Sequence, residues 1–235
     1  MIGLGCFSIL DVLRKPARIT KAYKIREMDI HNILKKTPIL PVVVFDKYEH
    51  ALPLANALME GGITTFEITL RTPVALGAIE LLKSKMPECT VGAGTVITPA
   101  QFFEIKQAGV DFAVSPGIST ELIEMAEKEN IPYLPAIATP SEILLAIQHK
   151  LSFLKFFPAG LNGGLAALRN FMSIFPAIRF CPTGGVDQGN MINYFSLKNV
   201  ICVGGSWLAP KNLVESQQWN AITELVLKAI KTLTS

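Results

Sequence analysis

One lysine stands inside an apolar segment of the sequence and is the first candidate for chemistry. Lys155 is the only charged residue in the run 153–159, which reads Phe-Leu-Lys-Phe-Phe-Pro-Ala. Removal from water disfavours the charged form of an amine, and a neutral lysine amine can attack a carbonyl carbon to form a Schiff base. Alternatively, the stem of Lys155 packs on the core while its ammonium reaches water at a strand edge.

Other reactive side chains stand near the ends of further strand-like runs. Glu67, Thr69 and Arg71 alternate along one run and therefore share a face of the strand. Two charges in an apolar strand are costly unless they pair with each other or serve a function. Thr95, after the glycines of the next run, offers a hydroxyl at the same rim.

Glycine pairs and two apolar residues complete the candidate site. Thr183 is followed by Gly184 and Gly185, and Ser206 follows a second glycine pair, both at the ends of the last two runs. Barrels commonly bind a phosphate there through backbone amides, so a phosphate site is expected, although tight turns alone would also explain the glycines. Pro116 lies in a turn that could line a pocket, and Phe157 shares the strand face of Lys155.

The elements that must position these residues repeat along the chain. Apolar strand-like runs alternate with helix-like stretches at intervals of roughly 20–25 residues from residue 38 onward, and their continuous apolar character is typical of parallel strands buried on both faces. The eight runs are 38–45, 64–71, 89–96, 111–117, 131–138, 153–159, 178–185 and 199–206. Eight β/α units predict a single-domain (β/α)8 TIM barrel over residues 28–235. An open doubly wound sheet is the alternative, but the chain lacks its glycine-rich first turn.

The predicted starts of the helices support the same alternation of strands and helices. Thr72, Thr98 and Thr139 each precede a proline, as an N-cap residue precedes the first helical turn, and Thr120 could cap another helix.

Composition limits the other possibilities. The net charge of +3 divides into +4 for residues 1–27 and −1 for the remainder, so no basic face indicates nucleic acid. No apolar stretch is long enough to span a bilayer, and four cysteines without C-x-x-C spacing indicate reduced thiols in a cytoplasmic protein. We expect residues 1–27 to be a basic leader outside the native fold.

Histidines and metal ligands are scarce at the strand ends. The three histidines are His31, His50 and His149, and the latter two are interpreted as surface residues. We therefore expect neither a bound metal nor a cofactor, and amine chemistry is favoured over metal-assisted chemistry.

Taken in order, the motifs resemble those of the bacterial 2-keto-3-deoxy-6-phosphogluconate (KDPG) aldolases and 4-hydroxy-2-oxoglutarate (KHG) aldolases. The resemblance covers about residues 30–233 and is carried by segments 67–72, 91–96, 115–117, 155–159, 180–185 and 204–208. Gly160 and Ala136 depart from residues frequent in relatives, which leaves loop shape and substrate preference open.

The resemblance implies a class I aldolase, usually a homotrimer, that acts on a 2-keto acid substrate and releases pyruvate. It implies Lys155 as the Schiff-base lysine and Glu67 as the proton shuttle. The pyruvyl end would be bound by Arg71, Thr95, Pro116 and Phe157, and the distal hydroxyl and phosphate end by Thr183, Gly184, Gly185 and Ser206. The competing hypotheses are a phosphate-binding barrel isomerase or epimerase without an imine, in which Glu67 is the base, and a non-catalytic sugar-phosphate binder.

Overall fold

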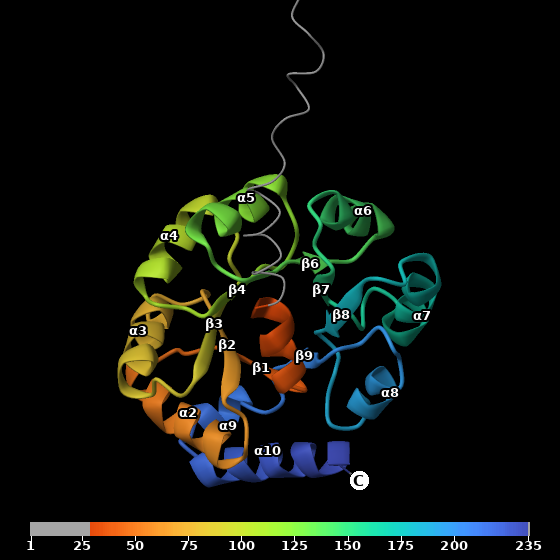
Figure 1. Cartoon of the computed structure of the whole chain (residues 1–235). Coiled ribbons are helices and arrows are strands. Elements are labelled where there is room, and N and C mark those ends of the chain that lie inside the picture. Colours follow the sequence, from red (N-terminus) through yellow and green to blue (C-terminus); the bar gives the residue numbers. More distant parts are fainter. Residues whose placement is uncertain (1–28, 235) are drawn as a thin grey trace, which may run out of the picture.

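The protein has an α/β fold in which parallel strands lie at the centre and helices surround them (Figure 1). The structure, a computed structural model, describes residues 29–234. All strand pairings among these residues are parallel. The predicted α/β class is therefore confirmed, whereas the proposed leader, residues 1–27, lies outside the described residues.

The strands form two sheets instead of one. A six-stranded sheet has the order β5-β4-β3-β2-β1-β9, and a three-stranded sheet has the order β6-β7-β8. The strands are β1 (Ile39–Val43), β2 (Thr65–Thr69), β3 (Thr90–Gly94), β4 (Phe112–Val114), β5 (Tyr133–Leu134), β6 (Ala136–Ile137), β7 (Phe153–Phe156), β8 (Arg179–Pro182) and β9 (Val203–Gly205).

One boundary between the two sheets is caused by a proline. The predicted strand 131–138 is divided into β5 and β6 at Pro135, which has no N–H to donate to a neighbouring strand. The Pro135 carbonyl still accepts a 2.8 Å hydrogen bond from the Lys155 amide. At the other boundary, isolated parallel bridges join Phe180 to Val200 and Thr183 to Gly204.

Helices follow most of the strands, as the alternating pattern predicts. Residues 29–36 are helical and precede β1. The remaining helices are η2 (Tyr48–His50), α2 (Ala51–Glu60), α3 (Ala75–Lys85), α4 (Pro99–Gln107), α5 (Thr120–Glu129), α6 (Pro140–Gln148), α7 (Gly164–Ile174), α8 (Met191–Phe195), α9 (Lys211–Glu215) and α10 (Trp219–Thr234).

The helix caps agree with the sequence at two of the four predicted positions. Capping boxes begin α4 at Thr98 and α6 at Thr139. The other two predictions are wrong. The Thr72 hydroxyl donates a 2.5 Å hydrogen bond to the Phe45 carbonyl in the loop after β1. Helix α3 instead has Val74 at its N-cap position and no side-chain cap. Ser119, and not Thr120, caps α5.

The helix at 29–36 covers the amino ends of the strands. Its Ile30 and Leu34 are buried in a cluster with strand residues Leu40 and Phe112 and with Cys202, just before β9. In Figure 1 this helix crosses the centre of the ring of helices. Because this apolar helix covers the amino ends, the carboxyl ends of the strands are the end at which polar side chains can gather.

The interpretation of His50 as a surface residue is wrong. His50 is only 3% exposed and its ring meets that of Trp219 edge-on, with centroids 5.6 Å apart. Within residues 29–234 no helix is long and apolar enough to cross a membrane, and no group of three or more His, Cys, Asp or Glu side chains could hold a metal ion.

Candidate active site

A buried ion pair joins two of the predicted catalytic residues. Lys155 Nζ lies 3.0 Å from Glu67 Oε2 and 3.1 Å from Glu67 Oε1, although the two residues are 88 positions apart in the sequence. Lys155 is 5% exposed and Glu67 is 1% exposed. Since a buried charge is tolerated when it is paired and hydrogen-bonded, the carboxylate compensates for the burial of the ammonium.

The surrounding strands leave room for this pair. A Cβ atom at Gly94 would lie 2.1 Å from Glu67 Oε1, so any side chain there would displace the carboxylate. On the other side of the pair, the Phe157 ring centroid lies 5.4 Å from Lys155 Nζ, within the range of a cation–π contact. The glycine in strand β3 is therefore explained by the position of Glu67.

Arg71 and Thr95 are also brought together, at the carboxyl ends of β2 and β3. Arg71 Nε donates a 3.3 Å hydrogen bond to the Thr95 hydroxyl. Thr95 has a φ angle of 61°, which is rare for a β-branched residue. Strained residues of this kind cluster at functional sites. The alternative of an Arg71–Glu67 ion pair is not what the structure shows, because Glu67 pairs with Lys155.

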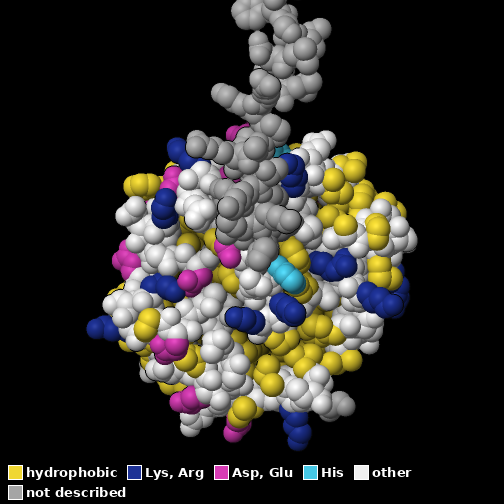
Figure 2. All heavy atoms as spheres, viewed as in Figure 1, with side chains coloured by type: hydrophobic (Ala, Val, Ile, Leu, Met, Phe, Trp, Pro, Cys, Tyr) yellow, Lys and Arg dark blue, Asp and Glu magenta, His cyan; other side chains and the backbone are white. Residues whose placement is uncertain are grey.

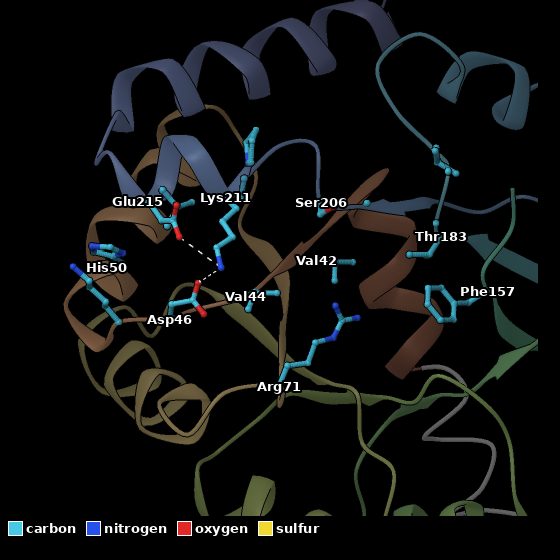
Figure 3. A pocket seen from close by; sticks show the side chains of 18 residues that line it. Val42, Val44, Asp46, His50, Arg71, Phe157, Thr183, Ser206, Lys211 and Glu215 are labelled. Carbon is cyan, nitrogen blue, oxygen red and sulfur yellow. Dashed lines mark ion pairs between the residues drawn. The ribbon is translucent and has the colours of Figure 1, made fainter. Parts of the chain in front are cut away.

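A cavity of about 480 Å³, which we call the mouth pocket, opens at the carboxyl ends of the strands (Figure 3). It is lined by Arg71, Phe157, Thr183, Gly184, Gly185 and Ser206 among the predicted residues. Lys155 and Glu67 are not part of the lining. Phe157 connects the two regions, since it lines the pocket and contacts the Lys155 ammonium.

The glycine turns expose backbone donors to the mouth pocket. Gly184 and Gly185 have φ angles of 86° and 80°, a conformation that favours glycine. Within residues 29–234, no hydrogen bond is donated by the amides of Gly184, Gly185 or Ser206. Three unpaired N–H groups at one pocket wall form a surface suited to an anion.

Thr183 and Pro116 are placed differently from the other predicted residues. The Thr183 hydroxyl lies at the pocket wall and donates a 3.3 Å hydrogen bond to the Cys181 carbonyl. Pro116 is exposed and does not line the mouth pocket. Its turn is held by Ser115, whose hydroxyl hydrogen-bonds the carbonyl of Gly117 and lies 2.6 Å from the Tyr133 hydroxyl.

The sequence interpretation missed the outer wall of the mouth pocket. Asp46, Lys47 and His50 follow β1, and Lys211 and Glu215 belong to α9. The charged pair Asp46-Lys47 directly after an apolar run was a usable signal, because functional groups gather at strand ends. Lys211 had no such signal, since it comes from a short helix beyond the last strand.

Comparison with known proteins places this chain in a family. Residues 30–225 match the family model described as KDPG and KHG aldolase. The KHG/KDPG aldolase of Escherichia coli (strain K12) is 44% identical over 200 residues, which cover 85% of this chain and 94% of the relative. The 2-dehydro-3-deoxy-phosphogluconate aldolase of Dickeya dadantii is 46% identical over 198 residues, which cover 84% and 93% of the two chains.

A solved structure agrees with these relatives. The KDPG aldolase from Legionella pneumophila, with pyruvate captured as a covalent carbinolamine intermediate, is 44% identical and superposes with a TM-score of 0.83. The match covers 85% of this chain and 97% of the Legionella chain. Family model, sequence relatives and fold therefore agree, and the chain belongs to the KDPG and KHG aldolase family.

Proposed function

We propose that this protein is a class I aldolase that cleaves 2-keto-3-deoxy-6-phosphogluconate to pyruvate and glyceraldehyde 3-phosphate. The buried Lys155–Glu67 pair is the observation that carries the proposal, because it sets an amine beside a proton acceptor. The relatives named above have this activity in their names, and the Legionella protein holds pyruvate as a carbinolamine. Cleavage of 4-hydroxy-2-oxoglutarate to pyruvate and glyoxylate would use the same chemistry.

The first half of the reaction forms the imine. The Lys155 ammonium transfers a proton to Glu67 across their 3.0 Å contact, and the neutral amine attacks the C2 ketone of the substrate. The adduct is a carbinolamine. Glu67 returns the proton to the departing hydroxyl, water leaves, and a protonated imine remains on Lys155.

The second half breaks the carbon–carbon bond. Glu67 takes the proton of the C4 hydroxyl, directly or through a water, as the C3–C4 bond breaks and its electron pair moves into the imine. The products are the aldehyde and an enamine of pyruvate. Protonation of the enamine carbon and hydrolysis of the imine then release pyruvate and restore the Lys155 amine.

Arg71 and Thr95 would bind the pyruvyl carboxylate. A guanidinium can bind a carboxylate through two parallel hydrogen bonds, and Arg71 is already oriented by the Thr95 hydroxyl. Phe157 would pack beside the pyruvyl methylene, and Pro116 would approach it from the turn after β4. These contacts would direct the C2 ketone toward Lys155.

The distal end of the substrate would occupy the other side of the mouth pocket. The unpaired amides of Gly184, Gly185 and Ser206 suit phosphate oxygens, and the Thr183 hydroxyl suits a substrate hydroxyl. Binding energy from this remote group would hold the reacting bond in position. No metal or cofactor takes part in this scheme.

The finer features of fold, assembly and location are part of the same proposal. We infer that the strands close into a (β/α)8 barrel. In this barrel β5 and β6 form one strand interrupted at Pro135, and the bridges Phe180–Val200 and Thr183–Gly204 join the remaining edges of the two sheets.

We infer a homotrimer, for which the exposed Leu144 and Ile147 on α6 supply apolar surface. Hydrophobic side chains gather over the α6 and α7 side in Figure 2. The buried free thiols suit the reducing cytoplasm.

Pyruvate release from both substrates tests the proposal. The purified protein should cleave both 2-keto acids, and Lys155→Ala should abolish cleavage. Glu67→Gln should lower kcat by about 100- to 10,000-fold, the usual contribution of a positioned acid or base. Activity that survives Lys155→Ala would exclude the imine mechanism.

A further inference from the structure

One cation on the wall of the mouth pocket is held between two carboxylates. Lys211 Nζ lies 3.0 Å from Asp46 Oδ2 and 3.6 Å from Glu215 Oε1 (Figure 3). Asp46 belongs to the loop after β1, while Lys211 and Glu215 belong to α9. The interaction therefore joins two elements that both line the pocket.

Lys211 lines the same pocket as the backbone amides that we propose to bind a phosphate. Lys211 follows Ser206 by five residues, and both line the mouth pocket together with Gly185. The other cations in the lining are Lys47 and Arg71, and Arg71 is engaged with Thr95. Among the lysine and arginine side chains that line the pocket, Lys211 is the one that the structure holds in ion pairs with carboxylates.

This ion pair can be exchanged for another partner. The side chains of Lys211 and Asp46 are 71% and 44% exposed, and ion pairs in water contribute little to stability because both groups remain solvated. A phosphate carries about −1.5 to −2 charges near pH 7 and three acceptor oxygens. It is therefore a stronger partner for the ammonium than a single exposed carboxylate.

We propose that Lys211 is a specificity-determining residue that leaves Asp46 and pairs with the phosphate of the substrate. Asp46 and Glu215 hold the ammonium at the pocket when no phosphate is bound. Without Lys211 the same two carboxylates would repel the phosphate. The inference rests on the proposed aldolase function and adds to it the residue that would distinguish phosphorylated from unphosphorylated substrates.

Kinetics on two substrates test this role. The quantity measured is the ratio of kcat/KM for 2-keto-3-deoxy-6-phosphogluconate to kcat/KM for 4-hydroxy-2-oxoglutarate, which has no phosphate. Lys211→Met should lower this ratio by about tenfold or more, the effect of losing one charge-assisted hydrogen bond. Asp46→Asn should raise the ratio, because the ammonium then has one competitor fewer.

A matched control separates the pocket from a general loss of charge. Lys106, also an exposed lysine, forms a 2.7 Å ion pair with Glu129 away from the pocket lining. Lys106→Met removes the same charge and should leave the substrate ratio unchanged. Inorganic phosphate should also inhibit the Lys211→Met protein about tenfold more weakly than the unaltered protein, for the same reason.

The outcomes distinguish this inference from the proposed function. An unchanged ratio in Lys211→Met, or an equal fall for both substrates, would overturn the role of Lys211 while leaving the aldolase proposal intact. Failure of the unaltered protein to cleave either substrate would overturn both.

Discussion

At the scale of single residues, the site depends on two charges that are acceptable only together. Lys155 and Glu67 have side chains that are 7% and 2% exposed, and each would be an isolated buried charge without the other. Removing one partner of a buried ion pair usually destabilises a protein because the remaining charge is left uncompensated. The same contact that permits burial gives the amine a route for its proton.

This reasoning predicts that stability and activity can be separated by mutation. Lys155→Met alone should lower the free energy of unfolding by about 3–5 kcal/mol, the usual effect of breaking a buried pair. The double variant Lys155→Met with Glu67→Gln should recover most of this loss, because no buried charge remains. Both proteins should be inactive.

Urea unfolding followed by circular dichroism measures the stabilities, and pyruvate release measures activity. A double variant no more stable than Lys155→Met would show that the pair does not behave as a coupled unit.

At the scale of elements, strand β3 is shaped around the carboxylate of strand β2. Gly94 has no room for a Cβ, because the Glu67 side chain occupies the space beside it. Gly92 is restricted in a similar way by Phe112, whose ring atoms would lie as close as 2.2 Å to a Cβ atom. The glycine-rich end of β3 is therefore required by its neighbours and not by flexibility.

The corresponding prediction uses two glycine variants. Gly94→Ala should displace Glu67, reduce kcat sharply and cost about 1–3 kcal/mol of stability, the range for overpacked cores. Gly117→Ala is the matched control, since a Cβ there would meet nothing within 4 Å. Equal activity in both variants, measured by pyruvate release, would contradict the proposed position of Glu67.

The sequence predicted where the strands lie along the chain, but not where a strand is interrupted or which distant residues bond to each other. The apolar runs that contain β1, β2 and β7 could be read directly, because buried parallel strands have few polar residues. The break at Pro135 results from one missing N–H donor, and the hydroxyl of Thr72 bonds to Phe45, 27 residues earlier, instead of capping a helix. Such details depend on packing between distant segments.

In the site too, residues with an unusual local sequence could be predicted, and residues defined by distant contacts could not. Lys155 and Glu67 were identified as separate candidates because each is an unusual charge in an apolar strand, and the structure brings them together. Lys211 could not be identified in this way. The sequence around it has no unusual feature, and its significance comes from the loop after β1, which places Asp46 in contact with it.

At the scale of the whole molecule, the core isolates the three cysteines of residues 29–234 from solvent. Cys89, Cys181 and Cys202 are free and each is at most 2% exposed. Burial raises the pKa of the Cys89 thiol to about 11 and also raises that of Cys202 well above its ordinary value. Only the thiolate reacts with alkylating reagents. Burial therefore opposes modification of all three thiols, and protonation opposes it further at Cys89 and Cys202.

The folded protein should therefore protect these three thiols from iodoacetamide at pH 7.5. Peptide mapping after alkylation should find Cys89, Cys181 and Cys202 unmodified in the native protein and modified after denaturation in guanidinium. Rapid native alkylation of any of the three would contradict the packing described.

The proposed trimer is tested by light scattering, which should give three times the 25.6 kDa chain mass.

Reductive trapping tests the central claim most directly. Incubation with pyruvate and borohydride should reduce the imine and add a pyruvate-derived mass at Lys155, located by peptide mass spectrometry. The Lys155→Ala protein should gain no such mass. Absence of an adduct in the unaltered protein, or an adduct that persists in Lys155→Ala, would contradict the Schiff-base mechanism and favour a barrel isomerase or epimerase that uses Glu67 as its base.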